Sequence, residues 1–176
     1  LFRSVRWVSV ARLGVQPGDT VWDVGAGTGA VTFELARKAM DGAVFAVERN
    51  TEAIELIAQN RQKLGGFNVH IVQGHAPEVL ADLPKPNCVF VGGSGGNMRK
   101  IIETALEKNP EARIAVNAIA LETLQETQRL FAEFGLQQVE ITQLSAARGK
   151  SIGCYTMMTA NNPVFILSGK GDKYGE

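Results

Sequence analysis

Short apolar runs and helix-like stripes alternate along the chain up to residue 135. In these runs the apolar residues follow one another and do not alternate with polar residues. They therefore predict strands buried on both faces, as in a parallel sheet. Apolar residues recur at helical spacing between these runs, and before the first of them. The predicted strands cover residues 20–25, 43–48, 69–74, 87–93 and 112–118, and the helical stripes fall within residues 2–11, 31–39, 54–64, 98–106 and 124–134.

Residues at the ends of the stripes predict where the helices begin and end. Asn50 and Ser94 are placed as N-caps, Asn109-Pro110 as a stop, and Gly135 just past the last helix.

After Gly135 the pattern changes. Two apolar runs, residues 139–144 and 162–169, have no helical stripe between them, and residues 147–150 are expected in the connecting loop. Parallel neighbours need a long crossover, so these runs predict an antiparallel pair at one edge of the sheet. The fold class is therefore α/β: a mostly parallel sheet with helices on both faces and a C-terminal antiparallel hairpin.

Length and charge narrow the function classes. The chain has 176 residues, 18 Lys plus Arg and 18 Asp plus Glu. We expect one domain over residues 1–176, although a start at Leu1 leaves open whether it is the C-terminal part of a longer chain. Balanced charge disfavours nucleic acid and anionic membranes as partners. Without an apolar span or a signal segment, we expect a cytoplasmic protein.

The chain has two cysteines, Cys88 and Cys154, and both lie among apolar or strand-like neighbours. Neither has the spacing of a metal site or a disulfide scaffold. We expect both to be packing residues in a reducing compartment, and no metal ion.

Candidate chemistry gathers where the first predicted strand ends. Gly25, Gly27 and Gly29 follow it, at the edge of a parallel sheet where ligands bind. The spacing lacks the third in-phase glycine of a dinucleotide fingerprint, and Asp23 would repel a pyrophosphate. Glu48 closes the second strand, where a carboxylate accepts hydrogen bonds from ribose hydroxyls. These residues favour a nucleoside with a cationic tail, although a chance acid beside a glycine-rich turn is the plainer alternative.

The segment DVGAGTG and the following acid resemble the class I S-adenosylmethionine-dependent methyltransferases, which have a Rossmann-like fold. For this chain the resemblance implies a seven-stranded sheet and S-adenosylmethionine as cofactor. Asp23 would order the loop and the cofactor's amino end, and Glu48 would bind the ribose diol. The loop residues that would line the methionine part are Gly25, Ala26, Gly27, Thr28 and Gly29, and the cofactor site would also include Arg49, Gly92 and Gly93.

A narrower resemblance covers nearly the whole chain. The segments GHAPEVL, VFVGGSGG and NPVFILSG are similar to the enzymes of cobalamin biosynthesis that methylate carbon 15 of precorrin-6B and decarboxylate its ring C acetate. This resemblance implies a tetrapyrrole substrate and a homotetramer. The family usually has an acid where His75 stands, so adenine recognition is expected from the Ala76 backbone, and a Thr-Lys pair where Leu1 and Phe2 stand. His75 could equally be a surface histidine.

Other candidates concern the substrate. GGSGG, residues 92–96, is expected to open the helix that carries Arg99 and Lys100 and to bind carboxylates, although a flexible turn with solvated basic residues behind it is the plainer alternative. Asn117, at the end of the fifth strand, could direct its amide at the substrate or cap the next helix. Arg148 and Lys150 are weaker candidates for carboxylate binding, and Glu34 is expected on a helix surface.

Two other functions remain open at this stage. The first is methylation of adenine in tRNA, because that family shares a similar glycine loop. The second is a non-catalytic S-adenosylmethionine-binding module. In the favoured function the conjugated macrocycle accepts the electrons released by decarboxylation, which suits a chain with two histidines and no evident base and nucleophile set.

Overall fold

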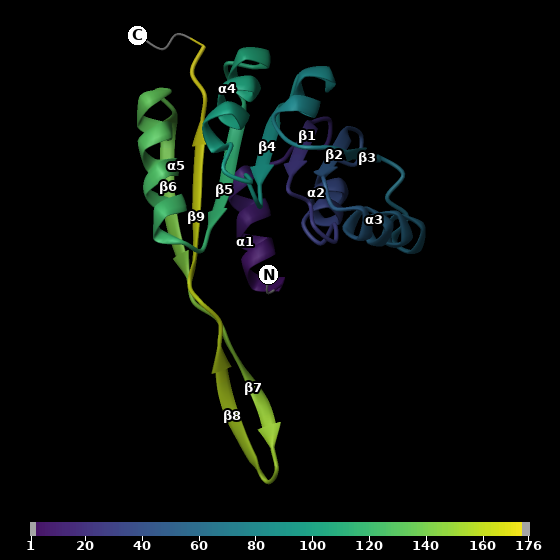
Figure 1. Cartoon of the computed structure of the whole chain (residues 1–176), viewed down its shortest axis with the longest axis vertical. Helices are drawn as coiled ribbons and strands as arrows, with labels where there is room; N and C mark the ends of the chain where they lie inside the picture. Colours follow the sequence, from purple (N-terminus) through teal and green to yellow (C-terminus); the bar gives the residue numbers. More distant parts are fainter. Residues whose placement is uncertain (1–2, 174–176) are drawn as a thin grey trace.

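The computed structural model describes residues 3–173 and has one large sheet at its centre (Figure 1). The strands of this sheet are β1 (Thr20–Val24), β2 (Ala43–Glu48), β3 (Val69–Gln73), β4 (Cys88–Val91), β5 (Arg113–Ala118), β6 (Gln137–Leu144) and β9 (Val164–Lys170). Their spatial order is β3-β2-β1-β4-β5-β9-β6. Strands β1 to β5 pair in parallel, whereas β9 is antiparallel to both β5 and β6. The predicted α/β sheet with a terminal antiparallel pair is confirmed.

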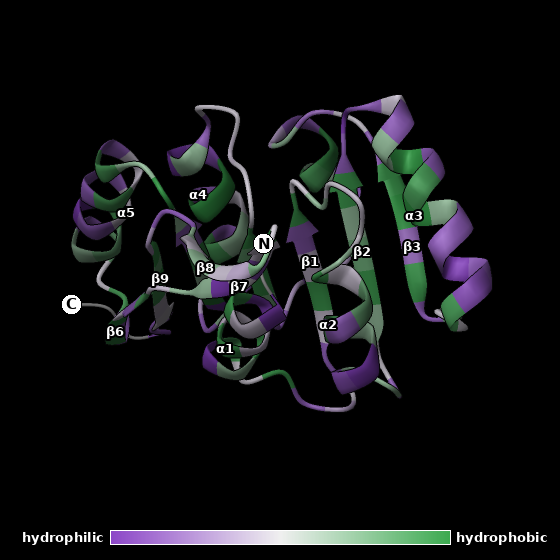
Figure 2. Cartoon of the chain, turned by 90° about the horizontal axis from the view of Figure 1, so that it is seen from below, coloured by the Kyte–Doolittle hydropathy of each residue, from purple (hydrophilic) through white to green (hydrophobic). Residues whose placement is uncertain are grey.

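Helices cover both faces of the sheet (Figure 2). On one face α1, α2 and α3 pack with inward side chains such as Val21, Val44 and Ala115. On the other face α4, α5 and the short 3₁₀ helix η1 pack on Trp22, Val89 and others. The bounds are α1 (Arg3–Leu13), α2 (Thr32–Lys38), α3 (Thr51–Leu64), η1 (Glu78–Asp82), α4 (Met98–Lys108) and α5 (Leu121–Glu133).

Most of the predicted helix ends are confirmed. Asn50 caps α3, since its side-chain oxygen accepts the N–H of Ala53 at 3.0 Å. Asn109 is the C-cap of α4, and Gly135 follows the end of α5 with φ +64°. The expected leading helix is α1, and Phe2 lies outside the described residues.

The prediction that Ser94 is an N-cap is wrong. Helix α4 begins only at Met98, after Asn97, and Asn97 makes no side-chain capping bond. The GGSGG segment is therefore a loop that precedes the helix and not its first turn. Serine is a common N-cap, which suggested an earlier helix start, whereas the apolar stripe begins at Met98, where the helix does begin.

Residues 147–150 were expected in a loop, and this is also wrong. They belong to β7 (Ala147–Ile152), which pairs antiparallel with β8 (Tyr155–Ala160). These two strands form a separate hairpin, here called the arm, which extends away from the body between β6 and β9 (Figure 1). Cys154 lies exposed at its turn, so the expectation that it is a packing residue is wrong, whereas Cys88 is buried as expected.

Candidate active site

The loop after β1 lies directly against the loop after β4. A Cβ atom on Gly25 would lie 2.6 Å from the carbonyl oxygen of Gly93, and Gly25 has φ +73°. Glycine is required at this position for two reasons: the backbone of Gly25 is in the left-handed region, and a side chain would collide with the backbone of Gly93. The two loops therefore meet backbone to backbone, with no side chain between them.

The other residues of the first glycine loop have distinct surroundings. Ala26 is buried, and its N–H donates to the Val47 carbonyl at 3.1 Å. Thr28 is exposed, and its carbonyl accepts from the side chain of Asn60. The loop ends at Gly29, and α2 begins at Thr32, two residues later than Ala30, where the sequence suggested a helix start.

Glu48, the last residue of β2, turns its carboxylate toward this loop. Its Oε2 accepts the N–H of Gly27 at 2.8 Å, and its Oε1 accepts the N–H groups of Arg49 and Asn50 at 2.8 and 2.9 Å. Burial opposes ionisation, but the three N–H donors outweigh it, and the pKa of Glu48 is lowered. An ionised carboxylate offers about four acceptor positions. With three occupied, Oε2 retains acceptor capacity for a ligand hydroxyl.

Asp23 lies beneath the loop and is fully buried. Its Oδ2 accepts from the Thr32 hydroxyl at 2.5 Å, while its Oδ1 has no partner among the described residues. Burial raises the pKa of Asp23 to about 7; the Thr32 hydrogen bond opposes this rise and the charge of Glu48 adds to it. The Asp23 side chain therefore supports the loop from inside the protein. It does not line any of the cavities described below.

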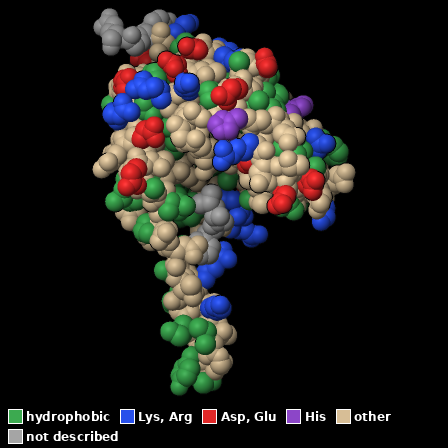
Figure 3. All heavy atoms as spheres, in the orientation of Figure 1, with side chains coloured by type: hydrophobic (Ala, Val, Ile, Leu, Met, Phe, Trp, Pro, Cys, Tyr) green, Lys and Arg blue, Asp and Glu red, His purple; other side chains and the backbone are tan. Residues whose placement is uncertain are grey.

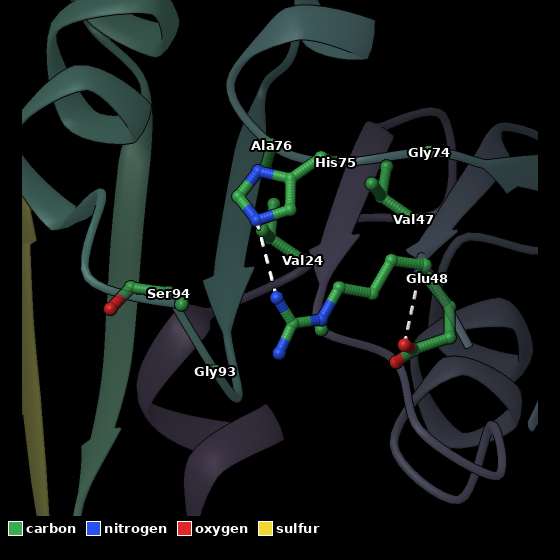
Figure 4. A pocket seen from close by; sticks show the side chains of 11 residues that line it. Val24, Val47, Glu48, Gly74, His75, Ala76, Gly93 and Ser94 are labelled. Carbon is green, nitrogen blue, oxygen red and sulfur yellow. Dashed lines mark hydrogen bonds between the residues drawn. The ribbon is translucent and has the colours of Figure 1, made fainter.

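The first cavity, here called the glycine-loop cavity, has a volume of about 230 Å³. Figure 4 shows Glu48 and His75 entering it from two different strand ends, with Gly93 and Ser94 on the opposite wall. Its lining residues are Val24, Gly25, Val47, Glu48, Arg49, Gly74, His75, Ala76, Gly93, Ser94 and Gly95. The carboxyl ends of β1, β2, β3 and β4 thus meet at one site, as expected for an open parallel sheet.

His75 has partners that the sequence could not identify. Its Nε2 lies 3.3 Å from Nη1 of Arg49, and its Nδ1 lies 3.3 Å from Oε2 of Glu78. Both contacts are satisfied when Arg49 donates to Nε2 and the Nδ1–H donates to Glu78. Arg49 and His75 therefore connect the ends of β2 and β3 across the cavity. The neighbouring Ala76 carbonyl accepts from the side chain of Asn97 at 3.2 Å.

A second cavity adjoins the first. The β4–β5 cavity, about 270 Å³, is lined by residues that follow these two strands, including Gly92, Asn117, Ile119 and Thr123. Gly93 and Ser94 line both cavities, so the two share a wall formed by the loop after β4. Gly92, predicted to bind cofactor, lines this second cavity.

The structure does not bring Arg99 to either cavity. Its guanidinium pairs with Glu133, the last residue of α5, and lies 5.6 Å from the ring centroid of Phe134. Helix α5 begins at the carboxyl edge of the sheet and ends at Glu133. The guanidinium of Arg99 is therefore held at the end of α5 that lies away from this edge. Arg148 and Lys150 lie on the arm, and Glu34 pairs with Arg37 on the surface of α2.

Two side chains were missed in the sequence. Thr32 holds Asp23, and Ser9 in α1 is fully buried with its hydroxyl 2.9 Å from Oδ1 of Asn117. A hydroxyl residue on the inward face of an amphipathic helix was the available signal for each.

Among residues 3–173, none of the helices combines the length and the apolar character that a membrane span needs.

Comparison with known proteins identifies the fold and then the family. The strand order β3-β2-β1-β4-β5-β9-β6, with β9 antiparallel to its neighbours, is that of the class I methyltransferase fold. A solved precorrin-6y C5,15-methyltransferase from Geobacter metallireducens superimposes with a TM-score of 0.89 and 35% identity, over 96% of this chain and 88% of that one. A structure titled precorrin 8W decarboxylase, from Methanobacterium thermoautotrophicum, gives a TM-score of 0.88 and 38% identity, over 96% and 90%.

The precorrin methyltransferase domain model matches residues 2–170. A protein of Pyrobaculum calidifontis named probable cobalt-precorrin-6B C(15)-methyltransferase (decarboxylating) is 41% identical over 94% of this chain and 85% of its own length. The chain therefore belongs to the precorrin methyltransferase family, and it is a methyltransferase.

Proposed function

We propose that this enzyme transfers the methyl group of S-adenosylmethionine to carbon 15 of precorrin-6B or its cobalt form and releases the ring C acetate carboxylate as carbon dioxide, in cobalamin biosynthesis. The relative from Pyrobaculum calidifontis carries this activity in its name. The observation that carries the proposal is the carboxylate of Glu48, held beside the first glycine loop at the wall of a cavity.

The residues present fit the cofactor. Glu48 is ionised at neutral pH and keeps an acceptor position for a ribose hydroxyl. Gly25 lines the cavity without a side chain, so a ligand can approach the backbone closely there. Arg49, His75 and Ala76 form the wall that would meet the base. We propose that Asp23 acts indirectly, by supporting the loop through Thr32.

Bound S-adenosylmethionine supplies a methyl group on a positively charged sulfur, which leaves as a neutral thioether. The protein's task is then to hold the acceptor carbon in line with that methyl group. Correct placement of two reactants can lower a barrier by roughly 7–11 kcal/mol. The β4–β5 cavity shares the Gly93–Ser94 wall with the glycine-loop cavity, so a substrate there would lie next to the cofactor. The conjugated macrocycle itself accepts the electrons left by decarboxylation.

The deciding experiment is incubation of the chain with precorrin-6B, or its cobalt form, and isotopically labelled S-adenosylmethionine. We expect a pigment that has gained one labelled methyl group and lost one carbon dioxide. Label in tRNA and none in pigment would favour the tRNA methyltransferase alternative, which a tRNA filter-binding titration at two salt concentrations also tests. Cofactor affinity with no label in either would favour the non-catalytic module.

We further propose that residues 1–176 act as one domain of a homo-oligomer, with a tetramer expected from the family resemblance. The arm supports this proposal, because a two-stranded hairpin is marginally stable alone. Its tip exposes apolar side chains to solvent (Figure 3): Ile152, Tyr155, Met157 and Met158 are 52–72% exposed. Light scattering on the chain and on a variant with Tyr155 and Met158 changed to Ser tests this. A lower mass of the variant is expected, and equal masses would contradict a role of the arm.

A further inference from the structure

The imidazole of His75 lies between two partners whose hydrogen-bonding roles are fixed. Nη1 of Arg49 lies 3.3 Å from its Nε2, and Oε2 of Glu78 lies 3.3 Å from its Nδ1. A guanidinium only donates, and an ionised carboxylate only accepts. In the neutral ring the proton is therefore on Nδ1, facing Glu78, and Nε2 carries the lone pair. The other tautomer would set two hydrogens against each other at Arg49 and two lone pairs against each other at Glu78.

Glu78 can hold this tautomer because its carboxyl group is ionised. It is exposed at the start of η1, three residues after His75. A hydrogen bond from its own backbone N–H lowers the pKa of Glu78, against a weaker effect of desolvation, and the hydrogen bond with His75 lowers the pKa further. The carboxylate therefore accepts the Nδ1–H at neutral pH.

The lone pair of Nε2 lies at the wall of the glycine-loop cavity. Arg49, His75 and Gly95 all line this cavity, and Figure 4 shows the His75 ring with its contact to the guanidinium as a dashed line. A Cβ atom on Gly95 would lie 3.6 Å from Nε2 and 4.0 Å from Nη1 of Arg49. Nε2 therefore lies where the ends of β2 and β3 and the loop after β4 come together.

Arg49 is an exchangeable partner of Nε2. Its side chain is exposed, and a hydrogen bond between exposed groups contributes little because water can replace it. The neighbouring backbone acceptors are already engaged: the His75 carbonyl accepts the Val79 N–H at 3.2 Å, and the Ala76 carbonyl accepts from the Asn97 side chain at 3.2 Å. A ligand N–H group that enters this end of the cavity would therefore find its acceptor at Nε2, once Arg49 moves away.

We propose that His75 selects the adenine base of the cofactor: Nε2 accepts from the exocyclic amino group, which displaces Arg49, and Glu78 is the positioning residue that keeps the proton on Nδ1. This inference rests on the proposed function, since it assumes an adenosine cofactor. With the ribose on Glu48, the base lies along the wall that contains His75 and Ala76. Hypoxanthine has an oxygen in place of the amino group, and this oxygen would face the lone pair of Nε2. The site should therefore prefer adenosine to inosine.

Calorimetric affinities for S-adenosylhomocysteine and S-inosylhomocysteine, which has the hypoxanthine base, test the proposal. His75→Phe removes both ring nitrogens, and His75→Asp restores an acceptor. Glu78→Ala removes the positioning group, and Arg49→Met removes the donor that must be displaced. The matched control is His70→Phe, because His70 is exposed on β3 and a phenyl ring can keep its stacking on Phe45. Nitrogen-15 NMR of the imidazole reports which ring nitrogen carries the proton.

We expect the parent chain to prefer S-adenosylhomocysteine by roughly tenfold, the scale of one hydrogen bond lost to an acceptor that faces another acceptor. His75→Phe should abolish this preference by weakening S-adenosylhomocysteine binding alone, and His75→Asp should keep it. Glu78→Ala should lower the preference about threefold and distribute the proton over both nitrogens, whereas the parent holds it on Nδ1. Arg49→Met should bind S-adenosylhomocysteine roughly twofold more tightly, and His70→Phe should match the parent.

Equal affinities of the parent chain for the two ligands, or a proton on Nε2, would overturn this inference and leave the proposed function standing. Weaker binding of S-adenosylhomocysteine by Arg49→Met would contradict the exchange of donors. If His75→Phe lost affinity for both ligands equally, its effect would be structural, and a lost preference in His75→Asp would then exclude His75 as the acceptor. No binding of S-adenosylhomocysteine by the parent chain would overturn the proposed function as well.

Discussion

The buried acid beneath the first glycine loop should make the stability of the fold depend on pH. Burial raises the pKa of Asp23 from 3.8 to about 7, so the folded chain holds a proton that the unfolded chain has released. Because the pKa is raised, the contribution of Asp23 to the free energy of unfolding is complete below about pH 4 and is lost as pH rises toward 7. A shift of roughly three units corresponds to about 4 kcal/mol, at 1.36 kcal/mol for each unit.

The substitution Asp23→Asn removes the titrating group and keeps the shape of the side chain. The amide still offers an oxygen to the Thr32 hydroxyl, and its nitrogen takes the unpartnered position of Oδ1. Any cost of burying that nitrogen is independent of pH. We therefore expect the stability of the variant, relative to the parent, to rise by about 2–3 kcal/mol between pH 5 and pH 8.

Urea unfolding at fixed protein concentration, measured at intervals from pH 5 to pH 8, provides the test. Asp82→Asn is the control, because it removes the same charge from an exposed position at the end of η1. The free energy of unfolding of this control should change with pH in the same way as that of the parent chain. If the curves of the parent and Asp23→Asn run parallel across this range, Asp23 does not hold its proton in the folded state, and the argument from burial is refuted.

Three other results are expected. Glu48→Gln should weaken S-adenosylhomocysteine binding by about tenfold or more in calorimetry, because a neutral amide is a poorer acceptor than a carboxylate; equal affinity would remove Glu48 from the cofactor site. Gly25→Ala should lower the melting temperature more than Gly14→Ala, since both glycines have positive φ but only the first meets a neighbouring backbone; equal losses would show that the contact with Gly93 is unimportant. Arg99→Ala should leave KM for the tetrapyrrole near that of the parent, and a large increase would mean that Arg99 leaves its ion pair to bind substrate.

The sheet was predictable because its signals are local. Continuous apolar runs gave the five parallel strands and the antiparallel pair, and Asn50 gave the start of α3. The position of Glu48 beside the glycine loop followed from the rule that parallel strands end at one edge. Each of these inferences needed only residues close in sequence, or the general geometry of an α/β sheet.

Contacts between distant segments were not predictable. Ser9 and Asn117 are separated by 108 positions, and no spacing rule connects α1 to the end of β5. The arm was missed because its strands, around Arg148 and Met157, have no buried face and therefore no apolar alternation. Ser94 failed as a cap because the glycines beside it can continue a loop as easily as begin a helix.

The contact between Gly25 and Gly93 ties together two segments that lie far apart in the chain. Gly25 cannot acquire a side chain unless the backbone of Gly93 retreats, whereas a Cβ atom on Gly93 would meet no atom within 4 Å. In an alignment of the family, we therefore expect glycine to be kept at position 25 while the residue at position 93 varies. What the loop after β4 contributes to this contact is its backbone path, which many side chains at position 93 can share.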